Sequence, residues 1–311
     1  MADALRLPPS MLVIERGWVS SNNIVFLGDD PAVVDTGYAR HSEQTVALVR
    51  HALGGQALER IINTHTHSDH IGGNAALARA YPGVRITIPA GEAEVVRDWD
   101  VAALLLEPMG QECERFAFDD TLHAGDVLSL GGLQWQAIAS PGHDMESLLL
   151  WCAGEGILIS ADALWGQGFG ILFPALPPLG DHAGAVAAQR ATLATIRDLA
   201  PRLVIPGHGA PFTDLEAALA HAAAQLDRLD SNPAGLLRHA AKVSLAFILM
   251  IDGRLDLATL GKRLARMRLV TDVNRAMYQL DEASLAELLA GELVKSGVAK
   301  RDAGWLVYAT A

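Results

Sequence analysis

Lysine is absent from the first 213 residues of this 311-residue chain. The formal net charge is −12, and residues 214–311 carry twelve acidic and twelve basic side chains, so the whole acidic excess lies in residues 1–213. Proteins that bind nucleic acid non-specifically use basic side chains to replace the counterions of the phosphates. The acidic first part therefore disfavours tight nucleic-acid binding, although a small RNA substrate held at a metal site stays open.

Cysteines and long apolar runs are also scarce. Only Cys113 and Cys152 are present, which excludes a disulfide framework in a chain of this length and favours small packed side chains. The most apolar run, residues 243–251, is far shorter than the roughly 20 residues of a membrane span. The first eleven residues lack the basic and apolar regions of a signal peptide. We expect a cytoplasmic protein that does not bind membranes.

Short strands and helices alternate through residues 1–213. Turn residues between the apolar runs 23–27 and 32–35 predict a hairpin, and residues 42–53 have helical spacing that ends at Gly54-Gly55. No internal repeat or low-complexity linker divides this part. We therefore predict one domain over residues 1–213 of mixed α and β structure.

The pattern changes at about residue 214. From residue 215 the sequence is predominantly helical to about residue 297, and two short strand-like pieces follow at 298–301 and 305–308. A helix over 282–296 followed by such a hairpin is the outline of a winged-helix unit. We predict a second, helical and winged-helix-like domain over residues 214–311.

Four side chains able to bind metal lie within six residues: His65, His67, Asp69 and His70. They follow an apolar strand and precede a helix that opens with two glycines. Neutral imidazoles and carboxylates are good ligands for zinc and similar divalent ions. His65 and His67 are placed to share one ion, and Asp69 and His70 to hold a second, so the segment predicts a site for two ions.

Two sites need further ligands, and three candidates occur in the same local context. His143 follows the apolar strand 133–139, Asp162 follows 156–160, and His208 follows 203–205. Each residue comes directly after a strand and a small residue. Three such matches in order strengthen the prediction of a metal site at the strand ends.

The whole set, His-x-His-x-Asp-His followed by Gly-His, Asp and Gly-His, resembles the metallo-β-lactamase-fold hydrolase superfamily over about residues 12–213. The resemblance implies an α+β fold, an αββα sandwich with its site at one edge of two sheets. It also implies that His65, His67 and His143 bind the first metal, that Asp69, His70 and His208 bind the second, and that Asp162 bridges them. Asp35, in Asp-Thr-Gly, matches a supporting residue of the family; an ordinary turn residue is the alternative.

The cofactors expected from this resemblance are two divalent ions, zinc first, with iron or manganese as alternatives that these ligands do not separate. We predict a metal-dependent hydrolase in which a metal-bridging hydroxide attacks a carbonyl or phosphoryl centre. Asp69 is the candidate to move a proton, because its free oxygen is expected beside the nucleophile.

The branches of the superfamily differ in the bond they cut. A bridging Asp162 resembles the thioesterase, lactonase and ribonuclease branches, whereas true zinc β-lactamases usually carry Cys or Ser there. A complete ligand set disfavours one-metal persulfide dioxygenases and a non-enzymatic scaffold. Glyoxalase II-like thioesterases share the ligands, but their basic glutathione-binding positions find no match here. Lactonases often have Tyr three residues after the bridging Asp, where this chain has Trp165.

Two segments bear on the substrate. The apolar loop 165–180 is the candidate pocket wall, with Trp165, Phe169, Ile171 and Phe173, and with His182 just after it as a further candidate or an ordinary surface histidine. This loop favours a small ester, thioester or lactone; packing against the tail or a partner subunit, including a homo-oligomer, is its alternative.

The tail gives the competing interpretation. A catalytic domain followed by a winged-helix-like tail resembles the β-lactamase-like-protein-2 group, some members of which cut single-stranded RNA. Lys262, Arg263, Arg266 and Arg268 are candidates to contact phosphate, and a solvated helix face is the alternative. A metal-dependent ribonuclease or phosphodiesterase is therefore the second functional hypothesis.

Overall fold

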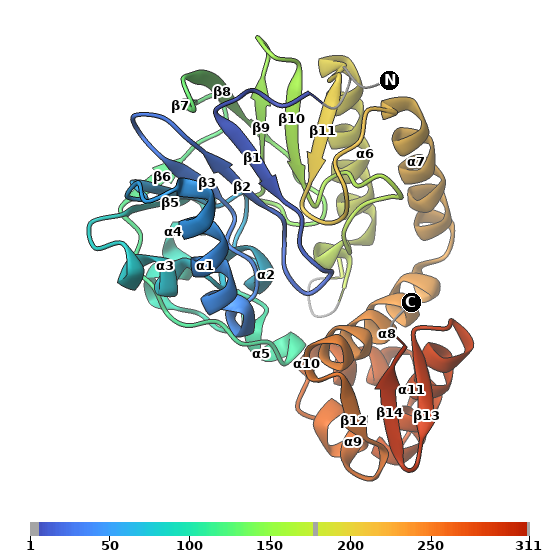
Figure 1. The fold of residues 1–311 in the computed structure, drawn as a ribbon. Coiled ribbons are helices and arrows are strands. Elements are labelled where there is room, and N and C mark those ends of the chain that lie inside the picture. The colour runs from blue at the N-terminus through green and yellow to red at the C-terminus, as the bar shows by residue number, and fades with distance from the viewer. Residues whose placement is uncertain (1–5, 177–179, 310–311) are drawn as a thin grey trace.

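Two β-sheets lie face to face in the larger part of the chain, and a smaller helical unit follows at the C-terminal end (Figure 1). The computed structural model describes residues 6–176 and 180–309. Residues 177–179, which belong to the predicted apolar loop, lie outside the described residues, as do the first five and the last two residues.

The first sheet has the strand order β1-β2-β3-β4-β5-β6. Its first three strands pair antiparallel, which confirms the predicted hairpin, and β3 to β6 pair parallel. The strands are β1 (Met11–Ile14), β2 (Asn23–Phe26), β3 (Ala32–Val34), β4 (Arg60–Ile62), β5 (Arg85–Pro89) and β6 (Asp120–Leu122).

The second sheet has the order β11-β10-β9-β8-β7. Only β10 and β11 pair parallel, because helix α6 connects them; the other neighbours are antiparallel. The strands are β7 (Val127–Leu130), β8 (Leu133–Ala139), β9 (Leu148–Cys152), β10 (Ile157–Ala161) and β11 (Leu203–Pro206).

The sandwich follows from the two-residue period of the strands. In the first sheet, Val33 and Ile61 face the helices, whereas Val34 and Ile62 face the second sheet. In the second sheet, Leu149 turns to the helical side, while its neighbours on the strand pack between the sheets. Both faces of each sheet are therefore apolar, which requires helices on the two outer faces and gives the predicted αββα order.

Helices α1 to α5 accompany the first sheet, and α6 and α7 accompany the second (Figure 1). The predicted helix over 42–53 is confirmed and ends at Gly54 in the left-handed conformation, φ +58°. The helices are α1 (Ser42–Leu53), α2 (Ser68–Ile71), α3 (Asn74–Ala80), α4 (Ala93–Asp98), α5 (Leu106–Met109), α6 (His182–Leu199) and α7 (Leu215–Ser231), with 3-10 turns η1 (Ala39–His41), η2 (Ala90–Glu92) and η3 (Phe173–Ala175).

The C-terminal unit consists of helices and a three-stranded sheet of order β12-β14-β13. The helix and hairpin expected at the C-terminal end are present, whereas the short strand β12 was not expected within the helical stretch. The elements are α8 (Pro233–Asp252), β12 (Arg254–Asp256), α9 (Leu257–Leu264), α10 (Arg268–Val273), the π-helical turn η4 (Asn274–Tyr278), α11 (Glu282–Lys295), β13 (Ala299–Asp302) and β14 (Trp305–Tyr308).

Helix α7 follows the boundary predicted at residue 214, and it packs along α6 (Figure 1). Because α7 packs with the sheet-bearing part of the chain, we use "tail unit" below for residues 233–309. The domain boundary at residue 214 stays a prediction. Helix α8 opens the tail unit. By length and composition it could cross a membrane, and 44% of its apolar window is buried inside the structure. Most of its buried apolar residues, including Leu245 and Ile248, belong to the core shared with α6 and α7.

Candidate metal centre

The seven predicted ligands meet at one edge of the two sheets. His65, His67, Asp69 and His70 lie between β4 and the end of α2, and the other three follow β8, β10 and β11. Strands that end at a common edge bring residues far apart in sequence together, as the sequence predicted. Asp69 is half-buried and the other six side chains are buried.

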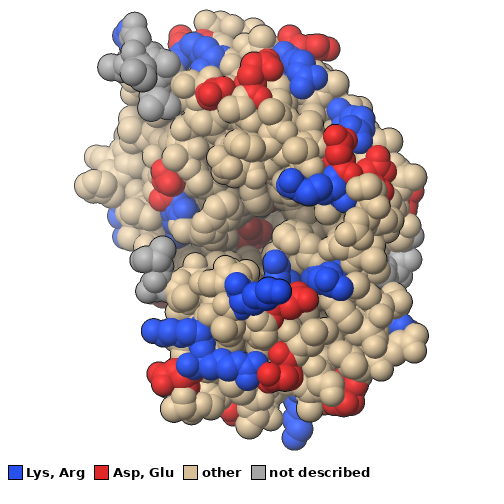
Figure 2. All heavy atoms as spheres, turned by 90° about the vertical axis from the view of Figure 1, so that its right-hand side faces the viewer, with Lys and Arg blue, Asp and Glu red and all other residues tan. Residues whose placement is uncertain are grey.

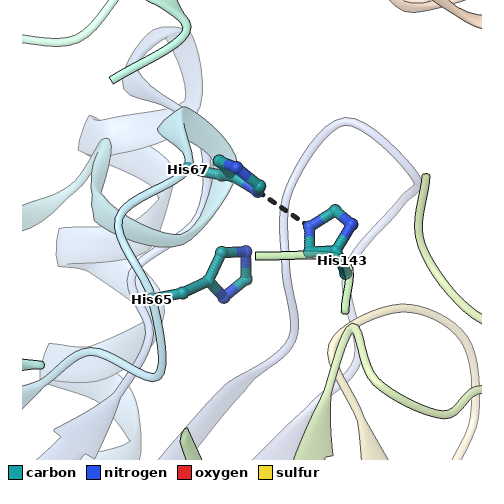
Figure 3. Close-up of side chains that lie close together, drawn as sticks. All are labelled: His65, His67 and His143. Atoms are coloured by element: carbon teal, nitrogen blue, oxygen red, sulfur yellow. Dashed lines mark hydrogen bonds between the residues drawn. The ribbon is translucent and has the colours of Figure 1, made fainter. Parts of the chain in front are cut away.

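Two groups of three side chains correspond to the two predicted metal sites. Candidate ligand atoms of His65, His67 and His143 lie within 4.8 Å of one another, and the same holds for Asp69, His70 and His208. The first three rings point toward a common centre, and His67 Nδ1 lies 2.8 Å from His143 Nε2 (Figure 3). These groups fit the coordination of divalent ions by imidazole and carboxylate.

Asp162 lies between the two groups. Its Oδ2 is 3.5 Å from His143 Nε2, and its Oδ1 is 3.4 Å from His70 Nε2 and 3.7 Å from His208 Nε2. One carboxylate oxygen thus faces each group, which is the arrangement that a bridging ligand needs. Gly207 permits this approach, because a Cβ atom there would lie 2.2 Å from Asp162 Oδ1.

Asp35 fixes the orientation of His70. Its Oδ2 lies 2.8 Å from His70 Nδ1, and its two oxygens accept hydrogen bonds from the backbone and hydroxyl of Thr64. His143 is held in the same way, since its Nδ1 lies 2.6 Å from the carbonyl oxygen of Ile171. Each ring then directs the lone pair of Nε2 into the cluster. Of the two interpretations of Asp35, the supporting role agrees with these contacts.

Unpaired nitrogen atoms give the strongest local sign that the cluster binds cations. His65 Nε2 and His70 Nε2 are buried and have no hydrogen-bond partner among the described residues. A buried polar atom without a partner costs about 1–3 kcal/mol, and two adjacent ones are unusual in a core. The donor set therefore fits divalent ions on an observation independent of the motif.

Electrostatics also prepare the ligands. Burial lowers the pKa of His67 to about 4, and burial together with His67 lowers the pKa of His143 to about 4, so both rings are neutral at pH 7. Burial opposes ionisation of Asp162, but the neighbouring His208 and His70 hold its pKa well below the usual range. His70 differs: burial lowers its pKa, but Asp35, then Asp162 and Asp69, raise it well above the ordinary value, so this ring must release a proton when it binds an ion.

Two cavities adjoin the cluster. The smaller has a volume of about 450 Å³ and the larger about 520 Å³, both within the usual range for small-molecule sites. His67, His143 and Phe173 line both cavities. Any group that reaches the cluster from either side therefore passes the same histidines and the same phenylalanine ring.

The structure brings most of the predicted pocket residues to the larger cavity. Trp165, Phe169, Ile171 and Phe173 all line it. His182 does not: it forms the first residue of α6 and lines neither cavity. Its position after the apolar loop was a weak signal, because the start of a helix turns the chain away from the loop.

Trp165 has a role that its position alone did not indicate. Its indole Nε1–H donates a hydrogen bond to Asp162 Oδ1 at 3.2 Å, and its ring meets the edge of His208 with centroids 5.4 Å apart. The residue lacks a hydroxyl group, but its N–H orients the carboxylate that lies between the two ligand groups.

Sequence reasoning missed three residues near the cluster. The ring of Trp18 stacks on His208 at 5.8 Å and 9°, and 55% of Trp18 remains exposed. Asp144 Oδ2 lies 3.6 Å from His67 Nε2, and Glu92 accepts a hydrogen bond from Thr66. Burial, then Asp144, raises the pKa of Glu92 to about 7. Asp144 follows His143 directly, which was a usable signal; Trp18 and Glu92 come from separate loops and gave none.

Comparisons with known proteins agree with this geometry. A sequence model described as the metallo-beta-lactamase superfamily matches residues 16–208. A hydroxyacylglutathione hydrolase from Ectopseudomonas mendocina (strain ymp) is 31% identical over 172 residues, which cover 54% of this chain and 57% of that protein. The chain thus spans less than two thirds of the length of this curated relative.

Solved structures resemble the fold of nearly the whole chain. A beta-lactamase domain protein from Burkholderia ambifaria has a TM-score of 0.58 at 22% identity, covering 98% of this chain and 94% of that one. A metallo-beta-lactamase family protein from Thermus thermophilus has a TM-score of 0.57 at 19% identity, covering 98% of this chain and 100% of that one. The shared fold therefore extends over the tail unit.

Proposed function

Because the chain belongs to the metallo-β-lactamase superfamily, we propose that it is a metal-dependent hydrolase that cleaves a small, neutral ester, thioester or lactone. The observation that carries the proposal is the position of Asp162 between two ligand groups, in the lining of the larger of two mainly apolar cavities that share His67 and His143. A scissile carbonyl bound there has one substituent for each cavity.

The ligand groups define what each side chain does. His65, His67 and His143 would hold one divalent ion, and Asp69, His70 and His208 would hold the other. When bound, the ions supply Lewis acidity, which lowers the pKa of water and stabilises negative charge on a carbonyl oxygen. Zinc is the first expectation, and iron or manganese are the alternatives.

Asp69 is placed to move the proton. It is half-buried and lines the larger cavity, and its Oδ2 lies 3.1 Å from His208 Nε2. It takes the proton of the attacking water and returns it to the leaving oxygen or sulfur. Trp165 keeps Asp162 oriented through its N–H group, and Phe173 shields the reacting carbonyl from bulk water.

The leaving group is expected to lack negative charge. Four carboxylates line the smaller cavity, from Glu92, Asp144, Glu146 and Asp272, against one guanidinium, that of Arg268. Arg268 also has a carboxylate beside it, since its Nε lies 3.6 Å from Asp272. The relative described above is named for a glutathione thioester, but this acidic lining favours neutral leaving groups over glutathione, which carries carboxylates.

The nuclease hypothesis receives less support from the tail. Arg263 forms an ion pair with Asp252, and Arg268 faces Asp272, so two of the four proposed phosphate-binding residues have acidic partners. Both cavities are lined mainly by apolar side chains, which suits an uncharged substrate better than a polyanion.

A substrate panel tests the proposal. Purified protein loaded with zinc, iron or manganese would be assayed with neutral acyl thioesters, esters, lactones, nitrocefin and labelled RNA, each with and without chelator. We expect chelator-sensitive cleavage of the thioesters, esters or lactones. Chelator-sensitive RNA cleavage without turnover of any acyl substrate would overturn the proposal in favour of the nuclease, and metal analysis of the same sample identifies the ions.

A further inference from the structure

The tail unit is fixed against the sheets beside the metal centre. Arg40 Nη1 lies 2.6 Å from Asp252 Oδ1 at the end of α8, and the rings of Tyr38 and Phe247 meet edge to face with centroids 5.4 Å apart. Helix α5 also packs against α10. Helix α8 is therefore held in a defined position relative to the ligand cluster, although it lies far from the cluster in sequence.

One face of α8 forms a wall of the larger cavity. Val243, Ala246, Phe247 and Met250, at positions i, i+3, i+4 and i+7 of the helix, all line it. Residues of the loop after β10 also line it, and so do five of the seven predicted ligands. The cavity is thus lined by both the tail unit and the sheet-bearing unit, and it reaches the metal centre.

The walls of this cavity carry little charge. Among residues 6–176 and 180–309, no lysine or arginine lines this cavity. Besides the predicted ligands, the ionisable side chains that line it in this part of the chain are His239 and Tyr308. Burial, then Lys242, lowers the pKa of His239, so this ring is neutral at pH 7. The space-filling view shows a hollow with mostly uncharged walls and an acidic side chain inside it, and charged side chains of both signs lie around its margin (Figure 2).

These observations give the tail unit a role in selecting the substrate. We propose that the larger cavity binds the acyl chain of the substrate against α8, so that the enzyme prefers medium-length, uncharged acyl groups. The proposal rests on the hydrolase function proposed above. Each methylene buried in such a cavity is expected to raise kcat/KM about three- to fourfold until the cavity is filled.

A chain-length series measures this directly. The zinc-loaded 311-residue protein would be assayed with straight-chain acyl thioesters of N-acetylcysteamine, from acetyl to dodecanoyl, so that the neutral leaving group stays constant. We expect kcat/KM to rise steeply with chain length and then level off. A flat profile, or a maximum at acetyl, would overturn the proposal while leaving the hydrolase function intact.

Substitution of the wall connects the preference to α8. Ala246→Phe fills the cavity, and it should lower the ratio of kcat/KM for decanoyl to that for acetyl at least tenfold. Ala234→Phe is the matched control, because Ala234 lies exposed on the same helix and lines neither cavity; it should leave the ratio unchanged. An equal effect of both substitutions would contradict the assignment of the wall.

A second variant covers the case in which Ala246→Phe does not fold. Met250→Ala enlarges the same cavity, and it should move the plateau of the series to longer chains. If Met250→Ala folds with the wild-type plateau, α8 does not limit the chain and the proposal fails.

Binding to metal-free protein separates this inference from the proposed function. The probe is 2-dodecanone, which has an acyl-like chain and no hydrolysable bond, and its affinity would be measured by isothermal titration calorimetry. We expect binding that weakens at least tenfold in Ala246→Phe and not in Ala234→Phe. Such binding by a protein that hydrolyses no acyl substrate would refute the hydrolase function but keep the cavity assignment; absence of binding would refute the assignment.

Discussion

The ligand cluster and the wall of the larger cavity are neighbours in space, yet they are built in opposite ways. The cluster consists of mostly buried polar side chains at strand ends, some with nitrogen atoms that have no hydrogen-bond partner within residues 6–176 and 180–309. The wall consists of apolar side chains on one helix of the tail unit. The cluster fixes which chemistry is available, whereas the wall determines which molecule reaches it, so the two should respond differently to substitution.

The largest expected effect comes from removing a ligand. His67→Ala or Asp162→Ala should lower metal content and activity together, because each opens a metal site. Loss of several kcal/mol of transition-state stabilisation corresponds to a decrease on the order of 10³-fold in kcat/KM. Metal analysis and kinetics on the same sample test this, with His123→Ala, an exposed histidine, as the control. Full activity in metal-depleted His67→Ala would show that the cluster does not supply the chemistry, and the contrast between cluster and wall would then fail.

A smaller effect is expected one step away from the ions. Asp35→Asn keeps the size of the side chain but cannot accept all the hydrogen bonds from His70 and Thr64. Supporting contacts of this kind typically change metal affinity about 10–100-fold. Titration with a competing chelator would measure the change, and Asp29→Asn, in the exposed turn after β2, serves as control. An unchanged affinity would return Asp35 to the role of a turn residue.

These two regions also differ in how well the sequence predicted them. His65, His67, Asp69 and His70 are adjacent in sequence, and the other ligands each follow a recognisable strand, so residue type and context were sufficient. The sandwich was expected only from the resemblance of these motifs to the superfamily, because strands that are apolar on both faces do not show which sheet they join. Trp18 and Glu92 reach the cluster from loops without a motif, and nothing in their neighbours indicates it.

The wall was harder to predict because it arises from packing between units. The spacing of Val243, Ala246 and Met250 predicts an ordinary apolar helix face. The sequence does not show whether such a face packs in a core or lines a cavity. The side chain of Trp165 was expected in the pocket, but its N–H contact with Asp162 depends on the path of the loop. Contacts between distant segments, rather than local patterns, therefore carry the information about the substrate.

Trp165 belongs to both regions, because it donates a hydrogen bond to Asp162 in the cluster and lines the larger cavity. Trp165→Phe keeps an aromatic ring in the wall but removes the N–H group that orients Asp162. A hydrogen bond to a charged group contributes about 1.5–3 kcal/mol, and bound ions retain part of the orientation, so kcat should fall about tenfold with a smaller change in KM. The exposed Trp305→Phe is the control. A change confined to KM would assign Trp165 to the wall alone.

The smallest effect tests how the tail unit holds the wall in place. Arg40→Ala removes the ion pairs with Asp252 and Glu112. Because Arg40 is 43% exposed, the loss in unfolding free energy should stay below about 1 kcal/mol. The ratio of kcat/KM for decanoyl to acetyl substrates should nevertheless fall about two- to threefold, since α8 gains freedom to move. The control is Arg79→Ala, which removes an exposed pair with Glu114 within the sheet-bearing unit and should lower stability by a similar amount without changing the ratio. If the ratio follows stability equally in both variants, the position of α8 does not control selection, and the wall acts only as part of the core.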